Sequence, residues 1–406
     1  MQCFGKILEI HTALEAEAII KRLGCDPVGV QIMKNKAVFR NILLEKVPTK
    51  GANLLKQTFL AKGGEVSLAR GSADLSIEET DVLISATLKQ YFQALAQLKS
   101  QPWGLPMIAN CIEGLLSHAE ALHRRDFEHN GMKFQIEQGK TLVMGILNIT
   151  PDSFSDGGQF NDPQGALKRV MEMIEAGADI IDIGAESTRP YGNALPISAD
   201  EELSRIIPVL EKIMPNSTVP ISIDTYKASV AEAVLNMGAH MINDVWGLQH
   251  DPSMAKVLSR YGVPVIIMHN RSCVLDNGDI ISEIEEFFRR SITIGLEAGI
   301  SIDSFILDPG IGFGKSCEQN LEILARLKEL KSFGLPIMIG TSRKRFIGET
   351  LILPVEDRVE GTGSTIVHAI LNGANIVRVH DVRQIARMVH MTDAIEERRQ
   401  RYYGQD

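Results

Sequence analysis

Cysteine is scarce in this sequence. The 406 residues include only five cysteines, and these are scattered, odd in number and never arranged as a CxxC pair. This pattern argues against a disulfide framework and against a zinc site. A reducing cytosol is the simplest setting for such a chain, so we expect a cytoplasmic protein.

Long apolar runs and an excess of basic residues are also missing. No run of about 18 uncharged apolar residues occurs, and Lys6 and Glu9 interrupt the N-terminus before the apolar part of a signal peptide could form. Lys and Arg number 42 against 51 Asp and Glu, which gives a formal net charge of −9. We therefore expect no membrane span, no signal peptide and no nucleic-acid partner.

The length is greater than that of a typical single domain of about 100–200 residues, which suggests two domains or one large barrel with an addition. From Thr141 to the end, short apolar runs rich in β-branched residues alternate with amphipathic segments, as in repeated βα units. The eight expected strands are Thr141–Leu147, Asp179–Ile183, Val219–Ile223, His240–Ile242, Pro264–Met268, Phe305–Leu307, Pro336–Ile339 and Ile376–Val379. The expected helices are Pro163–Ala176, Ala199–Met214, Ala228–Met237, Pro252–Tyr261, Ser282–Ala298, Gln319–Leu330, Val355–Leu371 and Arg383–Arg399.

Eight such units predict a TIM (β/α)8 barrel over residues 131–406, which would be the catalytic domain. A doubly wound open sheet is the alternative, but it would usually carry a GxGxxG phosphate loop after its first strand, and the sequence has none there. For residues 1–130 the sequence predicts a smaller α/β domain without a recognisable set of catalytic residues. Its expected elements are helices Ala13–Leu23, Asn53–Ala61, Asp81–Lys99 and Ile108–Arg125 and a strand Lys36–Leu44, and Glu128–Lys140 would be a connection or a short hairpin that closes the barrel.

Polar side chains follow all eight expected strands. In TIM barrels the chemistry lies at the carboxyl ends of the strands, so these residues are candidates for one site. Turn-forming residues are common at strand ends, but turns alone would rarely supply such a series. The series includes Asn148, Arg189, Asp224, Asn243, His269, Asp308, Lys344, Arg378 and His380.

These side chains suggest two kinds of ligand. Asp224, Asn243 and Asp308 offer carboxylate and amide edges that suit a flat, amidine-containing heterocycle. Arg378, His380 and Asn148 offer donors that suit an anion such as phosphate, and Lys344 and Arg189 add positive charge. The glycine-rich stretch Thr150–Gly158 predicts a flexible lid.

At these residues the sequence resembles dihydropteroate synthase, which joins 6-hydroxymethyl-7,8-dihydropterin pyrophosphate to p-aminobenzoate in folate biosynthesis and is the target of sulfonamides. Seven motifs in the order typical of that family carry the resemblance, from Met144 to about Val382. They are GILNITPDSFSDGG (145–158), DIGAESTRP (182–190), ISIDT (221–225), INDV (242–245), DPGIGFGK (308–315), TSRKRFIG (341–348) and RVHD (378–381).

The resemblance implies a role for each matching residue. It implies a pterin-binding set with two apolar walls, a pyrophosphate site with Mg²⁺ on Asn148 that Asp156 of the first lid loop assists, and a second lid loop that closes over p-aminobenzoate. The pterin set is Asp224, Asn243, Met268, Asp308, Phe313 and Lys344; the pyrophosphate set is Asn148, Arg378 and His380; the lid residues are Asp156, Thr188, Arg189 and Pro190. The catalytic groups would be Asp224, Asp308, Lys344, Arg378 and His380.

The expected enzyme is a transferase that takes small-molecule substrates and works as a homodimer. We expect dissociative loss of pyrophosphate followed by attack of the arylamine. A methyltetrahydrofolate-dependent corrinoid methyltransferase is the nearest alternative, but it would leave the predicted pyrophosphate site unused. A non-catalytic pterin-binding module is the other alternative, and the complete series of strand-end residues argues against it.

Overall fold

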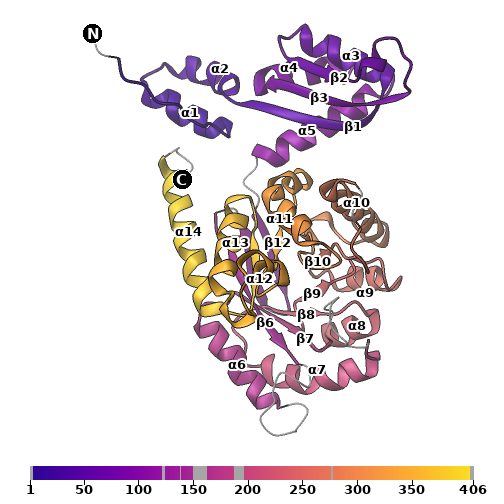
Figure 1. Ribbon diagram of the computed structural model, residues 1–406, viewed down its shortest axis with the longest axis vertical. Helices are drawn as coiled ribbons and strands as arrows, with labels where there is room; N and C mark the ends of the chain where they lie inside the picture. Colours follow the sequence, from indigo (N-terminus) through magenta and orange to yellow (C-terminus); the bar gives the residue numbers. More distant parts are fainter. Residues whose placement is uncertain are drawn as a thin grey trace. The chain divides into compact units, whose positions relative to one another are not determined.

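The computed structural model describes residues 3–120, 124–137, 139–149, 162–186, 196–275 and 278–402 (Figure 1). The chain forms two compact units, one of residues 1–121 with 396–406 and one of residues 122–395. Among the described helices, none is long and apolar enough to cross a membrane.

The first unit contains a three-stranded antiparallel sheet in the order β1-β3-β2. Val82, Ile84 and Ala86 of β3 are buried against helices, whereas Leu83 between them is exposed, so the sheet packs through one face. Its elements are α1 (Ala13–Arg22), α2 (Pro27–Ala37), β1 (Phe39–Pro48), α3 (Thr49–Leu60), β2 (Glu65–Leu68), η1 (Arg70–Ser72), β3 (Glu79–Thr87), α4 (Leu88–Leu98) and α5 (Leu105–Glu120).

The expected helix Asp81–Lys99 is wrong in its first part. Residues 79–87 form β3, because the alternation of buried and exposed side chains has the period of a strand. The helix begins only at Leu88, where Thr87 and Gln90 form a capping box: the Thr87 hydroxyl accepts from Gln90 N, and the Gln90 side chain accepts from Thr87 N at 2.7 Å. Helix α2 and strand β2 were not expected.

The second unit is the TIM barrel that the sequence predicts. Its eight parallel strands run in the order β11-β10-β9-β8-β7-β6-β13-β12, and a bridge between Leu307 and Ile337 joins the two ends of that series. The strands are β6 (Leu142–Asn148), β7 (Ile180–Gly184), β8 (Ile221–Asp224), β9 (Met241–Asp244), β10 (Val265–Met268), β11 (Phe305–Asp308), β12 (Met338–Ile339) and β13 (Ile376–Val379).

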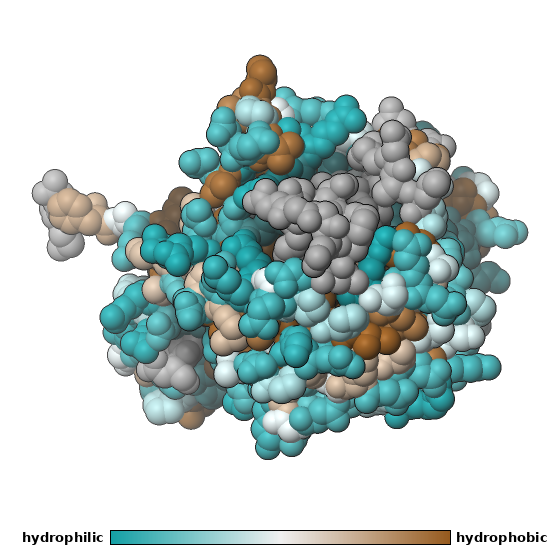
Figure 2. Space-filling model, turned by 90° about the horizontal axis from the view of Figure 1, so that it is seen from below, coloured by the Kyte–Doolittle hydropathy of each residue, from teal (hydrophilic) through white to brown (hydrophobic). Residues whose placement is uncertain are grey.

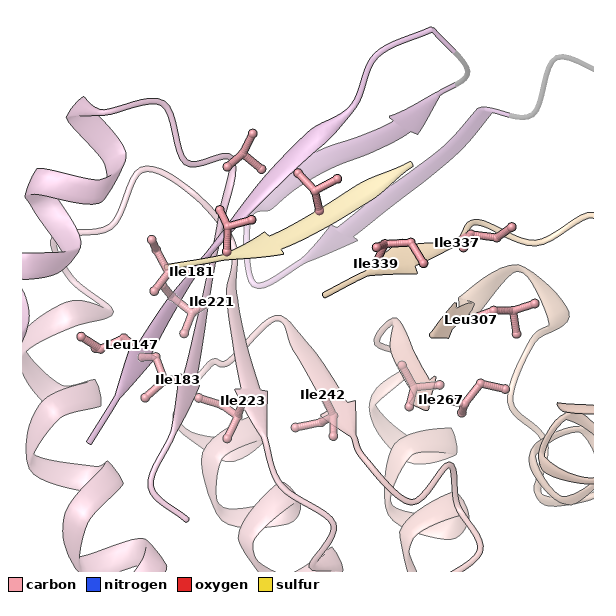
Figure 3. Packing of buried hydrophobic residues seen from close by; sticks show 14 of the residues in the cluster. Leu147, Ile181, Ile183, Ile221, Ile223, Ile242, Ile267, Leu307, Ile337 and Ile339 are labelled. Carbon is pink, nitrogen blue, oxygen red and sulfur yellow. The ribbon is translucent and has the colours of Figure 1, made fainter. Parts of the chain in front are cut away.

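Helices surround the barrel and bury one side of each strand. Ile181, Ile183, Ile223, Ile242 and Ile267 belong to this outer core (Figure 3). The helices are α6 (Pro163–Glu175), α7 (Ala199–Ile213), α8 (Ala228–Asn236), α9 (Met254–Tyr261), α10 (Ile280–Ala298), α11 (Cys317–Ala325), α12 (Arg345–Leu351), α13 (Val359–Leu371) and α14 (Val382–Tyr402), with short turns η3 (Ile302–Ser304), η4 (Leu327–Phe333) and η5 (Val355–Asp357). The sequence did not predict α12, and the expected helix Gln319–Leu330 is divided at Arg326 into α11 and η4.

The segment Glu128–Lys140, which we expected as a connection or hairpin, lies largely within a hairpin of β4 (Arg124–His129) and β5 (Met132–Glu137). Its turn is Asn130-Gly131 with positive φ at both residues, the conformation that a tight hairpin requires. Side chains of this hairpin pack against the apolar residues inside the barrel, so the hairpin covers the amino-terminal end of the strands. This inner cluster is Phe127, Phe134, Ile136, Leu142, Met144, Ile180, Met241, Ile266, Ile306, Met338 and Ile376.

Acid should weaken the barrel through His240, whose Nδ1 accepts from Ile221 N at 3.0 Å beside His129 of the hairpin. Burial lowers the pKa of His240 from 6.5 to about 4, and His129 adds to this effect. The unfolded chain therefore binds a proton on His240 at higher pH than the folded chain does. The free energy of unfolding therefore includes a contribution that is fully present above the pKa of His240 in the unfolded chain. About 2–3 kcal/mol of it is lost as the pH falls toward about 4.

Urea unfolding at a series of pH values measures this loss. His240→Gln keeps a side-chain acceptor for the Ile221 N–H but cannot titrate, so its free energy of unfolding should fall less steeply with acid. Equal slopes for the variant and the wild type would contradict the assignment.

Candidate active site

Polar side chains replace apolar ones toward the carboxyl ends of the barrel strands. Successive inward positions on a strand are two residues apart. Ile180 is therefore followed by Asp182, Met241 by Asn243, Ile306 by Asp308 and Ile376 by Arg378. The inside of the barrel thus changes from an apolar layer to a layer of charges and amides.

One arginine joins two strands of that layer. Arg378 Nε donates to Asp182 Oδ2 at 2.6 Å, and its Nη2 donates to Asp224 Oδ2 at 2.9 Å. Asn243 Nδ2 donates to the same Asp182 oxygen at 3.1 Å. A carboxylate oxygen accepts hydrogen bonds, so Asp182 faces the NH₂ group of the Asn243 amide. The amide oxygen of Asn243 therefore points away from Asp182.

Several buried acceptors of this layer have no partner among the described residues. They are Asp182 Oδ1, Asp224 Oδ1 and Asn243 Oδ1, together with the hydroxyl of Ser222. Buried polar atoms are nearly always hydrogen-bonded, so this group requires a ligand or water. The amide oxygen only accepts, and so do the carboxylate oxygens when they are ionised; a ring with several N–H donors along one edge suits them.

The charges of the layer oppose one another. Burial raises the pKa of Asp224, and the guanidinium of Arg378 acts against that rise. Burial also raises the pKa of Asp308, opposed by Lys344 and by Gly310 N, which donates to Asp308 Oδ1 at 2.8 Å. Burial outweighs these opposing groups: the pKa of Asp224 is raised to about 8, and the pKa of Asp308 also lies above its ordinary value.

The apolar residues expected beside the ring lie next to this layer. Met268 packs with Tyr226 and Val245, and Trp246 and Phe313 pack against them. Lys344 lies with its Nζ 4.6 Å from the centre of the Phe313 ring and donates to the carbonyl of Ile311. All six residues of the predicted pterin set therefore come together at the carboxyl end of the barrel strands.

Residues of the predicted pyrophosphate site lie on adjacent strands. Asn148 ends β6, which pairs with β13, where Arg378 lies, and His380 follows β13 directly. Ser342 holds His380 in place, since its hydroxyl accepts from His380 N at 3.1 Å and lies 3.0 Å from Nδ1. The remaining predicted residues Asp156, Thr188, Arg189 and Pro190, and the lid predicted over Thr150–Gly158, lie outside the described residues.

Two groups of residues were missed from the sequence. Asp182 and Ser222 were given no role, although they occupy inward positions of β7 and β8, and strand parity could have found them. Beside them, Lys227 forms ion pairs with Glu186 and with Glu202, at 2.5 Å in the second case, and Tyr226 donates to Glu186 at 2.8 Å. No sequence signal singled out that group.

Comparisons with known proteins agree with this geometry. A family model described as pterin binding enzyme matches residues 144–380. Dihydropteroate synthase of Bacillus subtilis is 52% identical over 256 residues, which are 63% of this chain and 89% of that protein. A crystal structure of the Clostridium difficile enzyme in the presence of pteroic acid matches with a TM-score of 0.61 and 50% identity, over 63% of this chain and 97% of that chain.

Two further matches extend the likeness. The Xanthomonas albilineans dihydropteroate synthase with 4-aminobenzoic acid has a TM-score of 0.64 and 37% identity, over 68% of this chain and 99% of that chain. A probable bifunctional folylpolyglutamate synthase/dihydropteroate synthase of Halobacterium salinarum is 36% identical over 95% of this chain and 46% of that protein, so its likeness includes the first unit. The chain therefore belongs to the pterin binding enzymes and, among them, to the dihydropteroate synthases.

Proposed function

We propose that the barrel condenses 6-hydroxymethyl-7,8-dihydropterin pyrophosphate with p-aminobenzoate to give 7,8-dihydropteroate and pyrophosphate. The unpartnered acceptors of Asp182, Asp224 and Asn243 carry the proposal, because the amidine edge of a pterin supplies the donors that they need. Relatives that are 45–52% identical are dihydropteroate synthases, so neither a corrinoid methyltransferase nor a non-catalytic module is favoured.

The reaction needs stabilisation of two opposite charges. The C–O bond to pyrophosphate breaks with its electron pair on the leaving group, and the pterin carries a delocalised cation. Asp224 and Asp308 stabilise that cation, while Arg378 and His380 stabilise the pyrophosphate. The lone pair of the arylamine then forms the C–N bond, and the nitrogen loses its proton to solvent.

The remaining predicted residues orient the substrates. Met268 and Phe313 enclose the ring, and Lys344 moves from the carbonyl of Ile311 to the pterin. Thr188, Arg189 and Pro190 of the second lid loop close over p-aminobenzoate, and Asp156 of the first lid loop assists at the pyrophosphate.

Replacing Asp308 by Asn should lower kcat about 10²–10³-fold, because a neutral amide cannot stabilise the pterin cation. Pyrophosphate release, followed with p-aminobenzoate in excess, measures this. Asp200→Asn, at an exposed position of α7, is the matched control and should keep wild-type kcat. Wild-type kcat in the Asp308 variant would remove this residue from the mechanism.

Mg²⁺ is the metal that we propose for the pyrophosphate. The described residues contain no cluster of three or more His, Cys, Asp or Glu that could hold a metal by itself. Mg²⁺ usually keeps several waters and relies on substrate phosphates, so the single amide oxygen of Asn148 suits it. When bound, the metal would neutralise charge on the leaving pyrophosphate.

Removal of divalent ions tests this proposal. EDTA should abolish pyrophosphate release, and an excess of Mg²⁺ should restore it, while Ca²⁺ should restore less because it prefers more ligands and longer bonds. Full activity after exhaustive chelation would contradict the role of Asn148.

The cysteines and the surface of the protein bear on the setting in which the enzyme works. All five cysteines are free thiols, which suits a cytoplasmic protein. On the face seen from below, the coloured residues are mostly hydrophilic, with hydrophobic residues in separate patches (Figure 2), which suits small-molecule substrates better than a membrane surface. We propose a homodimer, the commonest homo-oligomer.

The first unit acts as a structural or oligomerisation appendage in this proposal, since the Bacillus subtilis enzyme aligns over 89% of its length with 63% of this chain. Deleting residues 1–121 should leave kcat within about threefold of the full chain. Light scattering of both chains locates the dimer contact, and the full chain should have the mass of two copies. Loss of activity in a shortened chain that keeps its cooperative unfolding would contradict the appendage role.

A further inference from the structure

A buried lysine lies beneath the loop that carries the proposed pterin contacts. Lys315 is 3% exposed. Its Nζ donates to the carbonyls of Gly310 at 2.8 Å, Phe313 at 3.1 Å and His269 at 3.2 Å. These three bonds match the three donors of an ammonium group.

These carbonyls belong to two neighbouring parts of the site. Gly310 and Phe313 lie in the loop after β11, and that loop contains the N–H that binds Asp308 and the ring that packs near Met268. His269 directly follows Met268 at the end of β10. One ammonium group therefore ties the end of β10 to two positions in the loop after β11.

Close packing makes this tie sensitive to change. Gly310 and Gly314 have positive φ, and a Cβ on either would lie 1.9 Å from the carbonyl oxygen of His269 or 2.3 Å from that of Arg271. The loop backbone thus lies directly against the segment after β10. Three carbonyl dipoles converge in this buried space, and the three donors of one ammonium group satisfy all of them.

Lys344 cannot replace Lys315 in this role. It reaches the same loop through a different carbonyl, that of Ile311, and lies over the ring of Phe313. The two lysines therefore hold different parts of the loop, and Lys344 is the one that the resemblance places against substrate.

We infer that Lys315 is a positioning residue that fixes Asp308 and Phe313 for the pterin while touching neither substrate. The inference rests on the proposed function, because it concerns the pterin half of that site. Loss of Lys315 should weaken binding of the pterin substrate and leave binding of p-aminobenzoate unchanged. If the role of Lys315 were purely structural, its loss would reduce the amount of active enzyme and change neither KM.

The test uses the full chain with Lys315→Met and Lys315→Arg. In Lys315→Met the KM for the dihydropterin pyrophosphate should rise about tenfold or more, and the KM for p-aminobenzoate should stay within about twofold. Lys315→Arg keeps the charge but cannot direct three donors to one point, so its KM for the pterin should rise by a smaller factor. Calorimetry with 6-hydroxymethylpterin reads the same affinity without turnover.

Asp393→Asn is the control for general destabilisation. The carboxylate of Asp393 accepts from Thr141 N at 2.8 Å and from the Thr141 hydroxyl at 2.9 Å. This contact lies just before the amino-terminal end of β6. This variant should melt earlier than the wild type with both KM values unchanged.

Wild-type pterin affinity in Lys315→Met, or an equal rise of both KM values, would overturn the inference. If Lys315→Met does not unfold cooperatively, Lys315→Arg decides. Weaker pterin binding with a melting temperature near that of the wild type supports the positioning role, and wild-type pterin affinity refutes it. A wild-type chain that binds the pterin but releases no pyrophosphate would refute the proposed function instead, and the calorimetric comparison would still decide the role of Lys315.

Discussion

The site depends on one guanidinium group placed between two carboxylates inside the barrel. Arg378 binds Asp182 and Asp224, and Asp182 is fully buried. Removing one member of such a group leaves an uncompensated buried charge, which typically costs about 3–5 kcal/mol. Because the arginine uses one oxygen of each carboxylate, the second oxygens remain available for a ligand. The same interaction thus stabilises the barrel and presents its acceptors.

The rest of the unit supports this arrangement. The β4–β5 hairpin closes the amino-terminal end of the barrel with Phe127, Phe134 and Ile136. The inside of the barrel is therefore apolar toward the amino ends of the strands and polar toward their carboxyl ends. The end of β11 and the loop that follows it bring Asp308 and Phe313 to the same layer from the other side of the barrel. A flat ring placed there meets acceptors along its edge and apolar side chains on its faces.

The sequence predicted most of the barrel because the βα units have local signals: an apolar run, an amphipathic helix and, in several units, a glycine between the helix and the next strand. It also predicted which strand ends carry polar groups, and the structure brings Asp224, Asn243, Asp308 and Arg378 into one layer. It did not predict the partners of these groups, since the contact of Arg378 with Asp182 spans 196 positions in the sequence. In the first unit, the sequence predicts a helix across most of β3, because the alternation of β3 is short and runs directly into α4. Only the capping box at Thr87 separates the two elements.

The central claim is that this polar layer recognises the pterin ring. A crystal structure of the full chain with 6-hydroxymethylpterin tests it most directly. The account predicts the ring between Met268 and Phe313, with its N–H groups on Asp224 Oδ1 and Asn243 Oδ1 and the contacts of Arg378 preserved. A pterin bound elsewhere, or a ring that leaves these two oxygens without a partner, would contradict it.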